Sequence, residues 1–336
     1  MPDNRATLIE VAREAKTSKT SVSRFFGPER EKLSSALQAR IESAASRLGY
    51  RPNLMARGLK GGGTRLLGML VADIRNPFSV AAVHAVEQAA RARGYALIVC
   101  NTDNDPAQQQ RHLTLLASYS VEGLVINAVG APANELRALE RIGVPVVLLD
   151  REIPDLASDV VGLDNALAID TALDHLSERG YRRILYLTND PASVSARRQR
   201  MERITTGCAR RGLDARVQTR LDAESLYPAL GALVEPPNCA PAAVLCANAT
   251  ATLAAAKAFQ ALNLEMGRVG LMGIDELDWC ALVGPGVTTL AQPFEAIGEA
   301  ALARLLDPAA EPGRLRHAPR LIARGSTVYR DATSHT

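Results

Sequence analysis

From residue 65 onward the sequence alternates short apolar segments with amphipathic ones, and this alternation constrains the fold more than any other feature. Near-continuous apolar runs are typical of strands that are buried on both faces of a parallel sheet. The segment 79–93, which lies between two such runs, has the spacing of a helix that covers a sheet. The pattern predicts an α/β core with strands at 66–72, 95–100, 123–127, 144–150, 183–188, 242–247 and 269–275.

Polar residues stand at the ends of several predicted strands. Parallel sheets of this kind bind ligands beyond the carboxyl ends of their strands. Each polar residue taken alone is more often a turn former or a helix cap. Their repeated placement nevertheless predicts a shared ligand-binding cleft, formed by Asp73, Asn127, Asp150, Asn248 and Asp275.

The first 50 residues have a different pattern, which predicts three short helices at 7–15, 18–26 and 34–48. Two short helices that are joined by a tight turn and completed by a third form a helix-turn-helix unit. In such a unit the second helix faces the bases in the major groove, while hydroxyl groups and helix N-termini contact phosphates. The candidate DNA-binding residues, of which Thr7 and Ser18 also suit N-caps, are Thr7, Ser18, Lys19, Thr20, Ser21, Ser23 and Arg24.

Charge is distributed unevenly along the chain. Residues 1–65 hold 13 Lys and Arg against 6 Asp and Glu, whereas the remainder holds 26 against 30. A basic head on a slightly acidic body predicts that only the head meets a polyanion such as DNA. A merely solvated basic surface and a three-helix bundle that binds protein are the alternatives.

Composition limits the other classes of function. No segment reaches the roughly 18–20 uninterrupted apolar residues of a membrane span, and the N-terminus lacks the apolar core of a secretory signal. We therefore expect a cytoplasmic protein with no membrane partner. The 5 cysteines and 5 histidines are scattered, so we expect free thiols and neither a metal nor a cofactor. The sequence contains no dinucleotide fingerprint, phosphate-binding loop or nucleophile elbow, so we do not expect an enzyme.

Several segments resemble the lactose-repressor/galactose-repressor family. The head carries TLIEVAREAKTSKTSVSRFF and then ARIESAASRLGYRPNLMARGL, and the likeness continues through RLLGMLVADIRNPF, VEGLVIN, VVLLD, VGLDN and GVTTLAQPF. The chain is also similar to the 2-ketogluconate-utilisation repressors of pseudomonads. The resemblance implies a transcription regulator, in the first place a repressor, that binds palindromic operator DNA as a homodimer. Whether the effector induces or co-represses, and whether a higher oligomer forms, stay open.

The resemblance also implies the domain organisation. An all-α helix-turn-helix headpiece (1–51) precedes a hinge helix and linker (52–63). The α/β core (64–330) has the periplasmic-binding-protein type I fold with two doubly wound subdomains, and a polar tail (331–336) follows. The tail has no leucine heptads, which favours a dimer over a coiled-coil tetramer.

The hinge is too short to form a stable helix by itself, since isolated helices of fewer than roughly 12 residues are marginal in water. The resemblance implies that it orders on DNA, where Leu59 inserts into the minor groove and Ala56 permits close helix approach. Asn53 belongs to the same DNA-binding set. The triplet Gly61-Gly62-Gly63 departs from this pattern toward a looser linker.

The resemblance places an effector between the two subdomains. By motif the site is lined by Phe78, Ser79, Asp150, Arg200, Asn248, Asp275 and Gln292. Two departures disfavour a nucleobase or a neutral pyranose, because Ala249 replaces the usual aspartate and Leu221 replaces a common aromatic ring. Trp279 either supplies a ring to the site or packs in the core.

Arginines near the predicted cleft favour an anionic effector. Arg151 and Arg200 suit a carboxylate because a guanidinium group pairs with it bidentately. Asp275 suits sugar hydroxyls. We therefore expect a sugar acid, with 2-ketogluconate as the first candidate. A solute-binding protein for sugar transport is the alternative function, since it shares the core, but it requires export.

Overall fold

We describe the protein from a computed structural model of the 336-residue chain. The structure describes residues 6–27, 29–50, 63–130, 132–154, 156–192, 194–234, 240–307 and 311–329. The predicted hinge residues Asn53, Ala56 and Leu59 and the predicted tail 331–336 lie outside the described residues. The chain divides into two compact units, Met1–Thr64 and Arg65–Thr336.

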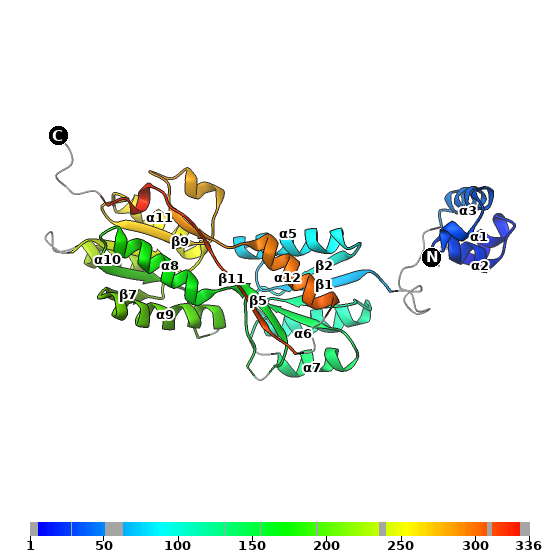
Figure 1. The fold of residues 1–336 in the computed structure, drawn as a ribbon, viewed down its shortest axis with the longest axis horizontal. Helices are drawn as coiled ribbons and strands as arrows, with labels where there is room; N and C mark the ends of the chain where they lie inside the picture. The colour runs from blue at the N-terminus through cyan, green and yellow to red at the C-terminus, as the bar shows by residue number, and fades with distance from the viewer. Residues whose placement is uncertain are drawn as a thin grey trace. The chain divides into compact units, whose positions relative to one another are not determined.

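The first unit is a small helical bundle. Its elements are α1 (Leu8–Glu14), α2 (Lys19–Phe25), the 3-10 helix η1 (Arg30–Lys32) and α3 (Ser35–Arg47) (Figure 1). Thr7 caps α1 in a capping box with Glu10, and Ser18 caps α2, so the predicted helix starts are confirmed. The apolar faces of the helices meet in a core built on Val11, Val22, Phe25, Ile41 and Ala45.

The second unit contains two six-stranded sheets with the same strand order. The order is β11-β5-β4-β3-β1-β2 in the first sheet and β12-β10-β9-β8-β6-β7 in the second. The strand pairs are parallel, except that β12 runs antiparallel to β10. The strands are β1 (Leu66–Val71), β2 (Ala96–Asn101), β3 (Leu124–Ile126), β4 (Val146–Leu149), β5 (Asp159–Leu163), β6 (Arg183–Leu187), β7 (Asp214–Gln218), β8 (Ala242–Cys246), β9 (Gly270–Ile274), β10 (Thr288–Ala291), β11 (Arg314–His317) and β12 (Arg320–Ile322).

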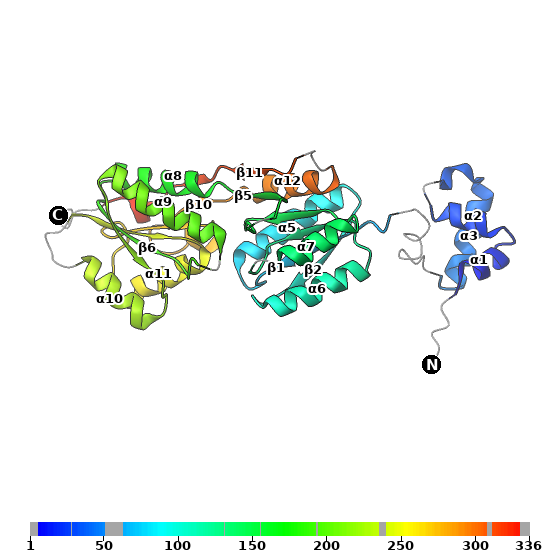
Figure 2. The ribbon, with the colours of Figure 1, turned by 90° about the horizontal axis from the view of Figure 1, so that it is seen from below.

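Helices cover both faces of each sheet (Figure 2). In the N-terminal subdomain, which holds the first sheet, one face carries α5 (Pro77–Ala92) and α12 (Phe294–Leu306) and the other carries α6 (Pro106–Ser118) and α7 (Ala133–Arg141). In the C-terminal subdomain, one face carries α8 (Asn165–Glu178) and α9 (Ser195–Arg211) and the other carries α10 (Ala223–Val234) and α11 (Ala249–Ala261). Two short 3-10 helices, η2 (Asp278–Ala281) and η3 (Gly325–Thr327), complete the C-terminal subdomain. The predicted pair of doubly wound α/β subdomains is confirmed.

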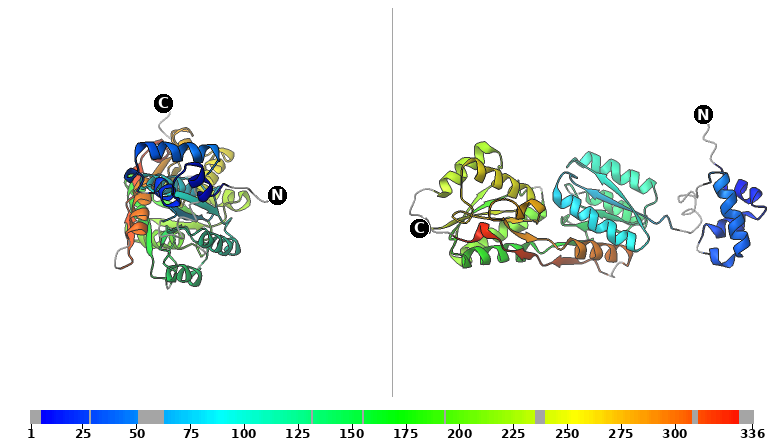
Figure 3. Two further views of the ribbon diagram at one scale, coloured as in Figure 1. Left: turned by 90° about the vertical axis from the view of Figure 1, so that its right-hand side faces the viewer. Right: turned by 90° about the horizontal axis from the view of Figure 1, so that it is seen from above.

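The chain passes between the subdomains three times: between β5 and α8, between β10 and α12, and between β11 and β12. The right panel of Figure 3 shows orange and red segments of the chain running along one side of the core. Each subdomain is therefore built from separated stretches of sequence. Because β5 and β10 both end where the chain crosses, the carboxyl ends of the parallel strands in both sheets face the boundary between the subdomains.

The cysteines within the described residues follow the prediction of free thiols. Cys100, Cys208, Cys246 and Cys280 are buried and unpaired, while Cys239 lies outside the described residues. None of the helices in the described parts of the chain is long and apolar enough to span a bilayer.

Candidate functional site

The candidate DNA-reading surface is the exposed side of α2. The buried side of this helix, with Val22 and Phe25, is fixed in the headpiece core. A lysine can donate to a guanine edge, and a threonine can contact a base edge or a thymine methyl group. The outward-facing candidates are Lys19, Thr20, Ser23 and Arg24, all exposed, and the half-buried Ser21.

Two of the candidate DNA-binding residues, Ser18 and Thr7, cap helices of the headpiece. The Ser18 hydroxyl accepts the Ser21 N–H at 3.0 Å, and the Thr7 hydroxyl accepts the Glu10 N–H at 3.3 Å. Because these hydroxyls already serve the headpiece, they are weaker candidates for DNA contact than Lys19 or Arg24. Arg24 forms an exposed ion pair with Glu29 at 3.3 Å.

The turn between α1 and α2 is fixed from the third helix. Lys16 has a left-handed backbone with φ 47°, a conformation that few residues other than glycine adopt. The Arg40 guanidinium donates to the carbonyl oxygens of Ala15 at 2.6 Å and Lys16 at 2.8 Å. These bonds hold the turn that sets the position of α2 within the headpiece.

The candidate effector site is built around two aspartates that follow equivalent strands. Asp150 follows β4 and Asp275 follows β9, and both have left-handed backbones, with φ 64° and 81°. Aspartate tolerates this conformation, and such residues cluster at functional sites. Gly162 in β5 lets the backbone of Asp150 pack closely against it, because a Cβ at Gly162 would lie 3.0 Å from the Asp150 Cα.

Arg200 joins three elements of the site. Its guanidinium donates from Nε to Asn165 Oδ1 at 2.7 Å and from Nη1 to the Ala247 carbonyl oxygen at 2.6 Å. Nη2 lies 3.9 Å from Asp150 Oδ1. Asn165 begins α8 and Ala247 follows β8, whereas Asp150 belongs to the other subdomain, so this buried side chain spans the subdomain boundary.

Several arginines gather around Asp150. Arg200, Arg151 and Arg197 act on it electrostatically together with Asp275, and Asp190 in turn acts on Arg197. Burial raises the pKa of Asp150, and Arg200 and Arg151 oppose that rise. Burial also lowers the pKa of Arg151 and of Arg197. The Nε of Arg151 is buried and has no hydrogen-bond partner among the described residues, so an anionic acceptor would be stabilised there.

Buried polar atoms without a hydrogen-bond partner collect at the same place. Among the described residues, four of six such side-chain atoms belong to this group, namely Asp150 Oδ1, Arg151 Nε, Tyr186 Oη and Gln292 Oε1. Each unpaired buried polar atom costs about 1–3 kcal/mol, and native structures contain few of them. Their concentration indicates that a polar ligand pairs with them.

Asp275 is held rigidly within the C-terminal subdomain. Its carboxylate accepts the Ala249 N–H at 3.1 Å and the Gln292 side-chain N–H at 2.6 Å. Asn248 caps α11 and donates from its amide to Asn189 Oδ1 at 3.2 Å. Gln292 thus bonds to Asp275 directly, whereas Asn248 only precedes Ala249, whose N–H bonds to Asp275; the three residues lie at the carboxyl ends of β10, β9 and β8.

Two strand-end residues of the N-terminal subdomain have visible structural roles. The Asn127 side chain is buried and donates to the Leu149 carbonyl oxygen at 2.9 Å, which ties the end of β3 to the end of β4. The Asp73 carboxylate accepts the Nε–H of the exposed Arg75 at 2.9 Å, and this bond lowers the pKa of Asp73. Both side chains therefore already serve the local structure at the strand ends.

The amino-terminal turn of α5 places an aromatic pair in the N-terminal subdomain. Phe78 and Phe294 meet edge to face with their ring centroids 5.5 Å apart. Ser79 is buried, and its backbone N–H bonds to the Asn76 carbonyl oxygen at 2.8 Å. The motif resemblance predicts Phe78 and Ser79 but not Phe294.

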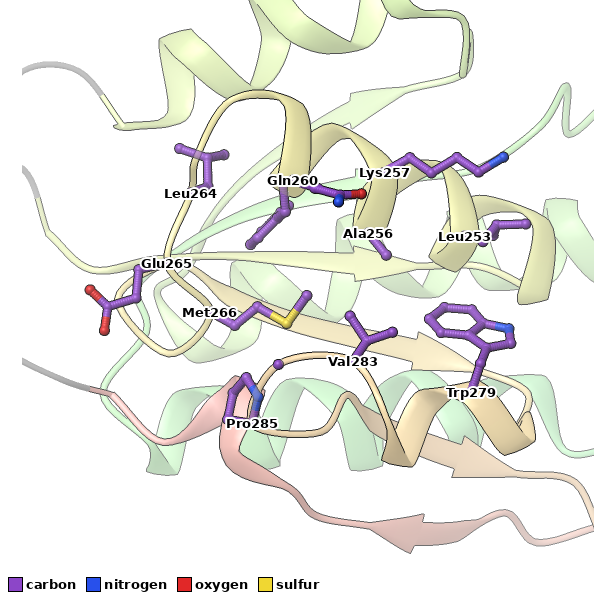
Figure 4. Close-up of a pocket in the computed structure, with 12 residues that line it drawn as sticks. Leu253, Ala256, Lys257, Gln260, Leu264, Glu265, Met266, Trp279, Val283 and Pro285 are labelled. Atoms are coloured by element: carbon purple, nitrogen blue, oxygen red, sulfur yellow. The ribbon is translucent and has the colours of Figure 1, made fainter.

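Trp279 packs in the core of the C-terminal subdomain, which is one of the two roles considered for it. It packs against the apolar cluster that lies between the second sheet and α10 and α11. It also lines a hollow of about 770 Å³ between α11 and the segment after β9, opposite Leu253 and Lys257 (Figure 4). The prediction that Trp279 supplies a ring to the effector site is therefore not supported, because its ring is already engaged with this cluster.

Three residues of the site escape prediction from the sequence. Tyr186 gives no signal because its ring suits a buried strand. Arg197 is obscured by the neighbouring arginines of α9, although it lies three residues from Arg200 and therefore on the same helix face. Asn165, which holds Arg200, ends the segment VGLDN. In the described parts of the chain no cluster of His, Cys, Asp and Glu suits a metal.

Comparisons with known proteins agree with this architecture. Residues 7–53 match the model of bacterial regulatory proteins of the LacI family, and residues 64–321 match that of periplasmic binding proteins and the sugar binding domain of the LacI family. The transcriptional regulator PtxS of Pseudomonas aeruginosa is 47% identical over 96% of each chain, and the regulator KdgR of Bacillus subtilis is 34% identical over 89% of this chain and 90% of its own. The Lac repressor bound to ONPG shares the fold with a TM-score of 0.82, at 23% identity over 96% of this chain and 100% of its own. This chain belongs to the LacI family of bacterial regulatory proteins.

Proposed function

We propose that this protein is a transcriptional repressor that binds palindromic operator DNA as a homodimer and releases it when a sugar acid binds the core. 2-Ketogluconate is the first candidate for that effector. The protein acts in the cytoplasm, where its operator lies. The proposed organisation is a headpiece (1–51), a hinge (52–63), an effector core (64–330) and a tail (331–336).

The observation that carries the effector class is the composition of the site around Asp150. Arg200, Arg151 and Arg197 all act on Asp150, and the buried Nε of Arg151 has no partner among the described residues, which favours an anion over a neutral sugar or a nucleobase. The unpaired oxygens of Asp150 and Gln292 suit hydroxyl donors, and the unpaired Arg151 Nε suits an acceptor. A ligand with both a carboxylate and several hydroxyls fits this set, and a sugar acid has both.

Calorimetric titration of the full-length protein tests the effector class. We expect 2-ketogluconate or gluconate to bind, and glucose to bind on the order of 100-fold more weakly, because glucose lacks the carboxylate whose charge-assisted hydrogen bonds contribute about 1.5–3 kcal/mol each. Tight binding of glucose or of a nucleobase, with no binding of either acid, contradicts the proposal.

The DNA-binding half is tested on sequences that the wild-type protein selects from a random pool. We expect Lys19→Ala and Arg24→Ala to weaken binding about tenfold or more, since each base or phosphate contact contributes about 1–3 kcal/mol. Arg47→Ala is the control, because it removes the same charge from the exposed end of α3. Equal binding by all three variants contradicts the assignment of α2.

The homodimer has a candidate surface in the C-terminal subdomain. Leu253, which lines the hollow together with Val283 and Trp279, is 42% exposed, and Leu282, the chain neighbour of Val283, is 81% exposed. Exposed apolar patches of this kind mark protein contacts. We expect Leu282→Asp to shift the protein toward monomer in analytical ultracentrifugation. An unchanged dimer at the same protein concentration excludes this surface.

Release of DNA requires that the effector bind one conformation of the repressor better than the other. Thermodynamic linkage then requires operator DNA to weaken effector binding by the same factor. The proposed hinge residues Asn53, Ala56 and Leu59 would contact DNA only in the operator-bound state. Tighter effector binding in the presence of operator identifies a co-repressor rather than an inducer.

A further inference from the structure

Tyr186 carries a hydroxyl group that the packing of the core does not explain. The residue lies in β6 and is fully buried, and its ring belongs to the apolar cluster between the second sheet and helices α8 and α9. Its hydroxyl has no hydrogen-bond partner among the described residues. A phenylalanine would fill the same volume without burying an unpaired polar atom, which destabilises a folded protein.

The surroundings of this hydroxyl are those of the candidate effector site. Arg200 and Arg197 act on Tyr186 electrostatically, and Arg200 is the same side chain that reaches Asp150. Burial raises the pKa of Tyr186, so the hydroxyl stays protonated and can donate. Guanidinium groups only donate hydrogen bonds. The hydroxyl hydrogen therefore needs an acceptor that these arginines cannot supply.

A second tyrosine in the same apolar cluster shows the usual arrangement. Tyr181 is also fully buried, and its hydroxyl donates to the Gly267 carbonyl oxygen at 2.6 Å. The fold thus satisfies the hydroxyl of Tyr181 by itself and leaves that of Tyr186 unsatisfied. The difference points to a ligand, because Tyr186 lies one residue before the carboxyl end of β6, where ligands bind in sheets of this order.

We propose that Tyr186 is a specificity-determining residue of the effector site, whose hydroxyl donates a hydrogen bond to the anionic oxygen that Arg200 pairs with. The inference rests on the proposed sugar-acid effector. A neutral sugar has no such oxygen, so this hydroxyl adds to the discrimination in favour of the acid. An ordered water that accepts the same hydrogen is the competing explanation.

The conservative pair Tyr186→Phe and Tyr181→Phe tests the inference. Each change removes one hydroxyl from the same cluster and keeps the ring. We expect Tyr186→Phe to weaken the binding of 2-ketogluconate or gluconate about tenfold, as for a hydrogen bond to a charged group, and to leave the urea midpoint unchanged or raised. Tyr181→Phe should lower the midpoint and leave the affinity for the acid unchanged.

The outcomes separate the two proposals. Acid binding by Tyr186→Phe within about twofold of wild type overturns the role of Tyr186, and identifies water as the partner of its hydroxyl. Binding of neither acid by the wild-type protein overturns the proposed effector class and the role of Tyr186 with it. A weaker affinity in both variants shows that the cluster as a whole supports the site, and also overturns a specific role for Tyr186.

Discussion

Replacing Arg200 with methionine tests the central contact of the effector site. Methionine keeps much of the apolar volume of the side chain but removes the guanidinium. Asn165 Oδ1 and the Ala247 carbonyl oxygen then lose donors that lie at 2.7 Å and 2.6 Å. Asp150, whose Oδ1 has no other partner among the described residues, loses the positive charge at 3.9 Å.

The expected loss of stability follows from these contacts. A hydrogen bond from a charged group contributes about 1.5–3 kcal/mol, and Arg200 makes two of them. Breaking a buried ion pair by removing one partner costs about 3–5 kcal/mol. These contacts belong to one side chain and their costs overlap, so they do not add. We therefore expect the free energy of unfolding of the core to fall by about 3–5 kcal/mol, and Tm to fall on the order of 10 °C.

Urea unfolding followed by tryptophan fluorescence measures this change. The chain has 1 tryptophan, Trp279, which lies in the same subdomain as Arg200 and reports its unfolding. Arg198→Met is the matched control, because Arg198 is exposed on the same helix and its side chain makes no ion pair or hydrogen bond with the described residues. Equal midpoints for the two variants at one protein concentration refute the reasoning.

Three further changes have defined outcomes. Thr7→Ala removes the capping box of α1 and should lower the stability of the headpiece by about 1 kcal/mol, measured by hydrogen exchange of the α1 amides. Burial lowers the pKa of His175, so the unfolded chain binds a proton that the native chain does not as the pH falls below about 6.5. Stability should therefore decline between about pH 7.5 and about pH 5.5, and His175→Gln should reduce that decline in urea midpoints. Burial raises the pKa of Cys208 to about 11 and also raises that of Cys246, so iodoacetamide should label neither thiol until the protein unfolds, as peptide mass spectrometry will show.

All seven predicted strands occur within two residues of their expected bounds. Six of them are central strands that are largely buried, and the seventh, β2, is a largely exposed or half-buried sheet edge whose sequence is nevertheless an apolar run. The pattern does not predict β5, β7, β10, β11 and β12. β7, β11 and β12 are sheet edges whose residues are largely exposed or half-buried, so they carry no apolar run. β5 and β10 are buried, but each stands directly before a crossing of the chain and not before a helix of its own subdomain.

The residues of the effector site are predicted less completely than the strands, for a different reason. Asp150 and Asp275 could be predicted because strand ends of parallel sheets meet at one edge. Gln292 follows only from the motif resemblance, because the pattern does not predict β10. The rotation of α9 about its axis decides which of its arginines face the site. Because several arginines lie close together in this segment, the sequence does not show which of them face inward. Tyr186 could not be predicted, because its role depends on an absent hydrogen-bond partner, which only a three-dimensional arrangement reveals.

Helix α9 also connects the subdomains at a second point, and this contact gives a quantitative test of closure. The buried Ser195 hydroxyl accepts the Glu152 N–H at 2.8 Å across the subdomain boundary. Ser195→Ala removes one hydrogen bond of about 1 kcal/mol, which can shift an open–closed equilibrium by at most about fivefold. If the effector binds the closed core, calorimetry should show a loss of affinity of up to about fivefold. Thr205→Ala, an exposed position on the same helix, should show none. A loss well beyond tenfold would mean that Ser195 touches the effector itself, and no loss would mean that this bond does not contribute to closure.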